Sequence, residues 1–306
     1  MNDLASVQMN IPIVFSFDKR IILGAAVAIK SLISNAKPNT IYSIKILHSD
    51  IELKFQKRLS ALVENTQHSM SFHYINPKIF KDAPHNKKSW TELVYYRLLI
   101  PELFQEYDKV IYCDVDVLFM GDLQEAYCID LQGYEMAAVP VEENKKDSMI
   151  CHKYFPENTN KHIYISSFLV MNCKLMREEN TVKKFHSVIK TIGNRLKFFD
   201  LDTLNIACDR FLPLPFNYGV FYSITHFDNI EYASEYKFLT SIYSKKQLEE
   251  AKQNPIFIHY AGKLGKPWRM KKNKVPLNYK KYMDNLPENL KIYTFRDIRK
   301  RLFGKP

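Results

Sequence analysis

A strand, a helix and a second strand follow one another closely near the start of the chain, and this pattern constrains the fold more than any other feature. Residues 11–17 form a short, β-branched and nearly continuous apolar run, which is typical of a strand buried on both faces. A helical pattern follows over residues 21–35, and a second β-branched run covers residues 42–47. This order predicts a βαβ unit, and therefore an α/β fold with a largely parallel sheet.

The alternation of strands and helices continues through most of the chain. We expect further strands at 70–75, 109–113, 136–139, 168–172 and 255–260, and further helices at 52–65, 90–104, 174–190 and 200–208. The polar residues 142–162 are predicted to form a loop or a lid. Because ligands of open α/β sheets bind beyond the carboxyl ends of the strands, polar side chains at those ends are the first candidates for a functional site.

Charge divides the chain into a neutral body and a basic tail. A chain of 306 residues fits one large domain or two small ones. Residues 263–306 contain 14 Lys or Arg and 3 Asp or Glu, whereas residues 1–262 contain 30 of each kind. We therefore expect a body at 1–268 and a separate tail at 269–306, where an anionic partner would bind. The five cysteines are scattered without a CxxC pair, which argues against a disulfide framework or a structural zinc site.

The tail carries an amphipathic helical pattern. Its apolar residues recur every three or four positions and alternate with basic ones: Ile292, Phe295, Ile298 and Leu302 with Arg296, Arg299, Lys300 and Arg301. This pattern predicts a helix that lies on an anionic membrane surface. Two alternatives stay open, namely an apolar stripe that packs on the body and a disordered basic arm. Tyrosines among the tail lysines could also serve a nucleic acid, but no nucleic-acid-binding motif accompanies them, so we expect no nucleic-acid partner.

The sequence offers no membrane span and no targeting segment. The longest weakly polar stretch, at 21–33, is too short to cross a bilayer and contains Lys30. The first residues lack the positive charge that begins a signal peptide. The expected location is the cytoplasm, with peripheral attachment to the inner face of the cell membrane.

Two carboxylates follow the strand predicted at 109–113. Asp114 and Asp116 flank Val115, and because side chains alternate along an extended segment, both carboxylates face one side and can share a hard divalent cation. The alternative is a pair that caps a turn or binds an arginine. A second Asp-x-Asp occurs at 200–202, but only the first pair follows a buried strand, where unpaired carboxylates would be costly.

An imidazole ends the last predicted strand. His259 is followed by a segment with Gly262 and Lys266, in which glycine permits close approach of the backbone to a ligand and lysine can bind phosphate. A nitrogen ligand beside two carboxylates favours manganese over magnesium, although magnesium remains an alternative. The other interpretation is a buried core histidine beside a solvated loop.

These segments resemble glycosyltransferase family 8 over about residues 11–268. The resemblance rests on Tyr96-Arg97-Leu98-Leu99-Ile100-Pro101-Glu102-Leu103, on 107–116, which ends in Asp114-Val115-Asp116, and on His259-Tyr260-Ala261-Gly262 with Lys266-Pro267-Trp268. The family implies a GT-A fold, which is Rossmann-like with a mixed central sheet, a UDP-sugar donor and manganese. It is the retaining group that includes bacterial lipopolysaccharide galactosyl- and glucosyltransferases.

The resemblance also assigns roles to particular residues. It implies Asp114, Asp116 and His259 as metal ligands, with Asp116 and Asp200 as the catalytic carboxylates. It implies that Asp200 holds hydroxyls of the donor sugar and that Lys266 binds phosphate. The donor site it implies consists of Ser16, Asp18 at the uracil end, Arg97, Asp114, Val115, Ser166, Gly262 and Lys266. Without the resemblance, a helix cap for Asp200 and a helix-surface or carboxylate-paired role for Arg97 are the preferred interpretations.

The chain departs from the family pattern around the expected sugar and base. Arg20 and Ile21 stand where the family usually has a polar residue and an aromatic, and Ile165 begins the segment that usually reads Asn-Ser-Gly. Leu201 replaces a glutamine that lies near the reacting carbon in family members, and it can neither attack nor hydrogen bond. These residues would change the donor or reduce activity.

The function expected from the sequence is transfer of a hexose, glucose or galactose, from UDP to a lipopolysaccharide or another surface glycan, including a lipid-linked one. The alternative is a non-catalytic or weakly active member that binds a nucleotide sugar or a glycan. A sugar-phosphate nucleotidyltransferase is disfavoured, because residues 16–20 lack a glycine-rich phosphate loop.

Overall fold

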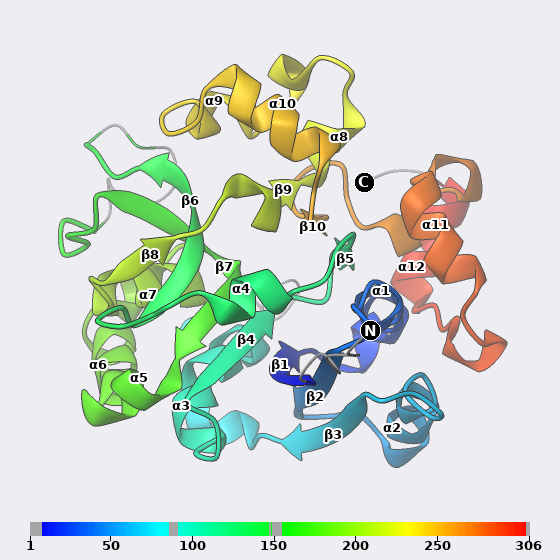
Figure 1. Ribbon diagram of the computed structural model, residues 1–306, viewed down its shortest axis with the longest axis horizontal. Helices are drawn as coiled ribbons and strands as arrows, with labels where there is room; N and C mark the ends of the chain where they lie inside the picture. Colours follow the sequence, from blue (N-terminus) through cyan, green and yellow to red (C-terminus); the bar gives the residue numbers. More distant parts are fainter. Residues whose placement is uncertain (1–7, 86–90, 147, 149–154, 304–306) are drawn as a thin grey trace, which may run out of the picture.

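The large sheet at the centre of the molecule is mixed. The structure, a computed structural model, describes residues 8–85, 91–146, 148 and 155–303. The sheet has the strand order β3-β2-β1-β4-β7-β6-β8 (Figure 1). Its strands are β1 (Met9–Ser16), β2 (Thr40–His48), β3 (Ser69–Tyr74), β4 (Lys109–Cys113), β6 (Met136–Glu143), β7 (His162–Asn172) and β8 (Phe211–Pro213).

The βαβ unit predicted near the start of the chain is confirmed. Strands β1 and β2 pair in parallel and are joined by helix α1 (Ile22–Ser34), which buries most of its residues against the sheet. Strands β3 and β4 extend the same parallel arrangement on either side, whereas β7 pairs antiparallel with both β4 and β6. The sheet is therefore parallel in its first half and mixed beyond β4, as the resemblance implied.

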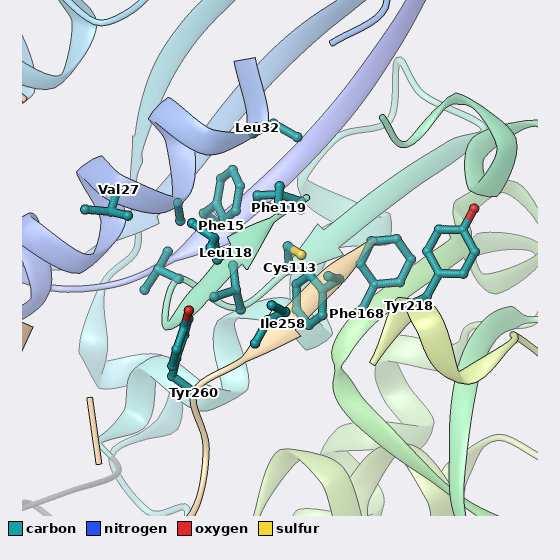
Figure 2. Packing of buried hydrophobic residues seen from close by; sticks show 14 of the residues in the cluster. Phe15, Val27, Leu32, Cys113, Leu118, Phe119, Phe168, Tyr218, Ile258 and Tyr260 are labelled. Carbon is teal, nitrogen blue, oxygen red and sulfur yellow. The ribbon is translucent and has the colours of Figure 1, made fainter. Parts of the chain in front are cut away.

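A second, small sheet lies beside the first. It consists of β5 (Val117–Phe119), β10 (Phe257–His259) and β9 (Val220–Phe221), in the order β5-β10-β9. The strand predicted at 255–260 is thus present, but it belongs to this small sheet and not to the central one. Figure 2 shows the apolar side chains that join the two sheets, with Phe168 beside Tyr218 near Ile258.

The remaining helices surround the sheets. They are α2 (Leu53–Ser60), α3 (Ile100–Leu103), α4 (Gln124–Cys128), α5 (Cys173–Glu178), α6 (Thr181–Ile192), α7 (Asp200–Ala207), α8 (Tyr222–His226), α9 (Tyr236–Leu239), α10 (Lys245–Gln253), α11 (Leu277–Asp284) and α12 (Phe295–Phe303). The helix predicted at 90–104 is mainly a 3-10 helix, Glu92–Leu99, continued by α3. The helix predicted at 174–190 is broken at Asn180, which has a left-handed backbone with φ of 54°.

The predicted loop at 142–162 is shorter than expected at both ends. Strand β6 continues to Glu143 and β7 begins at His162, and these two residues pair. The central positions 147 and 149–154 of this loop, which include Cys151, lie outside the described residues, so closure of a lid at 142–162 stays a prediction. Trp90, the first residue of the helix predicted at 90–104, also lies outside them.

The tail after residue 268 packs on the body in part. Trp268 and Tyr279 are buried and stack on each other, and the Tyr282 hydroxyl accepts a hydrogen bond from Asn35 at the end of α1. Figure 1 shows α11 beside α1, and α12 contacts the 3-10 helix Pro267–Arg269. A boundary at 268 stays a prediction, but these contacts mean that removal of the whole tail would uncover buried aromatic rings.

The amphipathic helix predicted in the tail is present from Phe295 onward as α12. Ile292, the first residue of the predicted stripe, precedes this helix and packs on the core, whereas the apolar residues of α12 are exposed. Phe295, Leu302 and Phe303 are 82%, 64% and 74% exposed. The helix is instead held by Asp297, which is 1% exposed and accepts a hydrogen bond of 2.6 Å from Arg269. Hence the apolar side chains of α12 face outward.

Candidate active site

The segment Asp114–Asp116 connects the two sheets. The amide of Asp114 donates to the carbonyl of Ser167 in β7 at 2.9 Å, and the carbonyl of Asp116 accepts from the amide of Tyr260, just after β10, at 2.9 Å. Val115 between them is buried in the core. Because the backbone is fixed at both ends and the middle side chain is buried, the two carboxylates face away from Val115, as the alternation predicted.

Asp114, Asp116 and His259 come together at this junction. One ligand atom from each side chain lies within 4.8 Å of the other two. Nε2 of His259 is 3.7 Å from Oδ2 of Asp114 and 3.4 Å from Oδ1 of Asp116. Two ligands of one divalent ion lie at most twice a bond length apart, which is about 4–5 Å for bonds of about 2.1–2.5 Å, so the spacing of these three side chains fits such an ion. The other ring nitrogen, Nδ1, is buried and has no hydrogen-bond partner among the described residues.

Lys266 is a cation that already contacts this cluster. Its ammonium donates to Oδ2 of Asp116 and, at 2.9 Å, to the carbonyl oxygen of Tyr260. Burial opposes ionisation of Asp116, but the charges of Lys266 and His259 outweigh it and hold the pKa of Asp116 well below its usual range. The carboxylate is therefore kept ionised, which is the state that binds a metal.

Arg97 joins Asp114 to a third carboxylate. Its guanidinium is buried and lies 3.0 Å from Oδ1 of Asp114 and 3.1 Å from Oδ2 of Asp200. It also donates to the carbonyl of Ser166 at 2.7 Å. Burial disfavours the charged guanidinium, but the carboxylates of Asp114 and Asp200 together raise the pKa of Arg97. A fixed charge at this position holds Asp114 and Asp200 on the same side of the junction.

The two carboxylates of the second Asp-x-Asp have different surroundings. Asp202 accepts hydrogen bonds from the amides of Lys197 and Phe198, both at 2.7 Å, and so fixes the turn that precedes α7. Asp200 begins α7 and faces Arg97. Burial raises the pKa of Asp200 to about 6, although Arg97 opposes the rise. Asp202 is therefore the structural member of this pair, and Asp200 is the one that joins the site.

Two other predicted site residues, Ser16 and Asp18, have partners of their own. Ser16 donates to the carbonyl of Leu93 at 3.1 Å. Asp18 is buried and paired with Arg20, whose NH2 nitrogen lies 2.5 Å from Oδ2 of Asp18. Within the described residues, no contact in the structure joins Ser16 or Asp18 to the three metal-ligand candidates. Their place at the uracil end of a donor stays a prediction, and Arg20 already neutralises the carboxylate there.

Two residues that sequence reasoning missed support the site. Tyr112 donates to Oδ1 of Asp114 at 2.9 Å, and its ring lies 4.3 Å from the guanidinium carbon of Arg97. It could have been found, because it precedes Asp114 by two residues and shares its face of the strand. Glu235 is buried against Gly262, where an added Cβ would lie 2.7 Å from Oε1 of Glu235. Nothing in the local sequence marks Glu235. The positive φ of 83° at Gly262 further restricts that position to glycine.

Comparison with known proteins gives consistent matches. A sequence model of glycosyl transferase family 8 matches residues 12–272. The chain is 25% identical over 276 residues to a lipopolysaccharide 1,2-glucosyltransferase of Escherichia coli, covering 89% of this chain and 77% of that protein. It is 25% identical over 263 residues to a lipopolysaccharide 1,3-galactosyltransferase of Salmonella typhimurium, covering 84% and 72% of the two chains.

Solved structures show the same fold. The galactosyltransferase LgtC, crystallised with donor and acceptor sugar analogues, superposes with a TM-score of 0.72 at 20% identity and covers 91% of this chain and 98% of that chain. The bifunctional glycosyltransferase WbbM superposes with a TM-score of 0.74 at 25% identity and covers 98% and 53% of the two chains.

Proposed function

Because the chain belongs to glycosyl transferase family 8 and has the GT-A fold, we propose that it is a retaining hexosyltransferase that uses a UDP-hexose and manganese. The acceptor in this proposal is a lipopolysaccharide or another surface glycan, in keeping with the names of its curated relatives. The observation that carries the proposal is the convergence of Asp114, Asp116 and His259 within 4.8 Å, beside the Arg97–Asp200 pair.

The residues of the site have complementary tasks in this proposal. Asp114, Asp116 and His259 would hold the divalent ion, which supplies Lewis-acid stabilisation of charge on the departing diphosphate. Lys266 would exchange its contact with Asp116 for a phosphate oxygen of the donor. Asp200 would hold hydroxyls of the donor sugar, because Arg97 fixes it on the same side as Asp114.

Leu201 bears on whether the chain is an active transferase. It is the second residue of α7, half-buried and packed on the core next to Asp200. An apolar side chain there can exclude water but offers no hydrogen bond to the sugar. The proposal therefore assigns the orientation of the hexose to Asp200 alone. The next experiment distinguishes an active transferase from a protein that only binds the donor.

Release of UDP tests the proposal directly. UDP-glucose, UDP-galactose and UDP-N-acetylglucosamine are each incubated with the protein, with and without Mn²⁺, and with a phosphorylated or plain glycan acceptor. We expect manganese-dependent release of UDP from one hexose donor. This release should be lost in Asp116→Asn and retained in Asp209→Asn, which changes an exposed aspartate that is not part of the candidate site. Nucleotide binding without release from any donor would instead identify a binding protein.

We further propose that the protein is cytoplasmic and works while attached to the inner face of the cell membrane through α12. No helix in the described part of the chain is long and apolar enough to cross a bilayer. The outward Phe295 and Leu302 lie on one helix with Arg296 and Arg299, which combines apolar and basic groups as an interfacial helix does.

Sedimentation with vesicles tests this attachment. Phe295→Ser with Leu302→Ser should abolish binding to vesicles of phosphatidylcholine and phosphatidylglycerol. The control, Leu53→Ser with Tyr74→Ser, removes two similarly exposed apolar side chains outside α12 and should bind as before. Equal binding of both variants would refute the attachment through α12.

A further inference from the structure

A pocket rich in lysine lies next to the candidate active site. It has a volume of about 450 Å³ and is bounded by the 262–266 loop, by residues 269–271, by Lys274 and by Lys300 of α12. We call it the basic pocket. Of the ten residues that line it, six are Lys or Arg and none is Asp or Glu. Its size is that of a site for a small molecule and not for a single ion.

The cations of the basic pocket are largely uncompensated. Arg269 is paired with Asp297, and Lys266 with Asp116. The other four are Lys263, Lys271, Lys274 and Lys300, and none of them forms an ion pair with any described residue. Like charges gathered around one cavity repel each other, and a bound anion would relieve that repulsion.

Lys300 lies in surroundings that disfavour its charged form. Burial and the nearby guanidinium groups of Arg296 and Arg269 lower the pKa of Lys300, while Asp297 only partly offsets them. Lys300 comes from α12, whereas Lys271 and Lys274 come from the segment after Trp268. The tail thus brings its charge to a cavity beside the 262–266 loop.

The basic pocket is distinct from the metal-ligand cluster. Asp114, Asp116, His259, Arg97 and Asp200 are all absent from its lining, although Gly262 and Lys266, which the family resemblance assigns to the donor site, belong to both. The 262–266 loop separates the two places: the ammonium of Lys266 is directed to Asp116, whereas the tail lysines line the pocket with the same loop. A ligand in the pocket would therefore lie beside the donor site without contacting the metal ligands.

We propose that the basic pocket binds a phosphate group carried by the acceptor, as a second phosphate site separate from that of the donor diphosphate. This inference rests on the proposed function for the identity of the ligand as an acceptor, but the phosphate site stands on the lysines alone. Lysine ammonium groups bind phosphate oxygens through charge-assisted hydrogen bonds. An acceptor held there by its phosphate would lie next to Lys266 and hence close to the transferred hexose.

Calorimetric titration with glucose 6-phosphate tests the phosphate site, and glucose serves as the uncharged control. The titration is made with the full chain saturated with UDP and Mn²⁺, so that the donor site is filled, and again in metal-free buffer without nucleotide. We expect glucose 6-phosphate, but not glucose, to bind in both conditions. The triple variant Lys271→Gln, Lys274→Gln, Lys300→Gln should lose about tenfold or more of its affinity for glucose 6-phosphate, because charge-assisted hydrogen bonds are lost.

The matched control removes the same charge from the same tail. Lys272→Gln, Lys280→Gln and Lys281→Gln change three residues that do not line the pocket and lie outside α12. This control should bind glucose 6-phosphate as the unchanged protein does. No binding by the unchanged protein, or an equal loss in the control, would overturn the proposal.

Two more measurements distinguish the phosphate site from a lipid-binding surface and from the donor site. Vesicles of equal parts phosphatidylcholine and phosphatidylglycerol are sedimented with both triple variants. If the pocket variant loses only vesicle binding and keeps glucose 6-phosphate, the lysines serve a lipid surface and the proposal is wrong. Binding of UDP with Mn²⁺ is measured first in the same samples. Its failure would count against the proposed function, whereas pocket-dependent binding of glucose 6-phosphate in metal-free buffer would still support the phosphate site.

Discussion

Replacement of Asp200 by asparagine should make the protein more stable and less active. Asp200 is 7% exposed, and burial raises its pKa from an ordinary value of 3.8 to about 6 in spite of the favourable charge of Arg97. At neutral pH the ionised carboxylate therefore opposes folding. A change of one pKa unit corresponds to about 1.4 kcal/mol, so the cost is about 3 kcal/mol at most. Asparagine removes this cost, so we expect Asp200→Asn to unfold with a free energy ~1–3 kcal/mol higher at neutral pH.

The sign of the pH dependence follows from the raised pKa. Between about pH 6 and pH 4 the folded protein holds a proton on Asp200 that the unfolded chain has released, so lowering the pH through this range stabilises the unchanged protein relative to the variant. The advantage of Asp200→Asn should be largest above about pH 7, shrink as the pH falls through about 6, and vanish near pH 4. Urea unfolding at a series of pH values measures it.

Asp202 supplies the matched control for activity. It lies on the same helix, and burial raises its pKa to about 6 as well, but its hydrogen bonds go to the turn before α7. Asp202→Asn should resemble Asp200→Asn in its stability and retain most of the transfer that Asp200→Asn loses. A variant Asp200→Asn that is less stable at neutral pH would refute the burial argument, and one that transfers hexose normally would refute the role of Asp200 at the sugar.

Three other substitutions give separate tests. His259→Ala should abolish manganese-dependent binding of UDP, and an unchanged manganese titration would contradict its role as a ligand. Lys266→Met should weaken the binding of UDP about tenfold, because a phosphate partner is lost. Mn²⁺ alone should bind at least as well as before, because the ammonium competes with the ion for Asp116. Calorimetry with each ligand distinguishes these effects. Gly24→Ala should lower the free energy of unfolding by ~1–3 kcal/mol, since its Cβ would lie 2.8 Å from ring carbons of Trp268, and an unchanged melting temperature would show that the ring can move.

The part of the site that was predictable from sequence depends on short-range geometry. Asp114 and Asp116 share a face because the backbone alternates, and the buried strand before them marks the position. His259 was predictable as the end of an apolar strand, although the family resemblance was needed to bring it to the same place. The structure confirms that these three side chains meet; their binding of a metal stays a proposal.

Other features could not be predicted because they depend on charges and volumes that only the folded chain brings together. The partnership of Arg97 with Asp200 joins a 3-10 helix to the start of α7. The pairing of Arg20 with Asp18 could not be predicted either, because the sequence does not distinguish an arginine that is paired with Asp18 from one that extends into solvent. Helix-period arguments also gave the right apolar stripe for α12 but could not say that it faces outward, because the buried anchor is the single polar residue Asp297.

The sequence by itself determined the α/β class, the βαβ start, the paired carboxylates after a buried strand and the basic tail, because each of these is written in the spacing of neighbouring residues. Only the tertiary structure decided that Asp202 fixes the turn before α7, that β10 belongs to a second sheet, and that the lysines of the tail gather around one cavity. The physical reason is that burial and electrostatic pairing depend on distances through space, and residues far apart in the chain acquire those distances only when it folds.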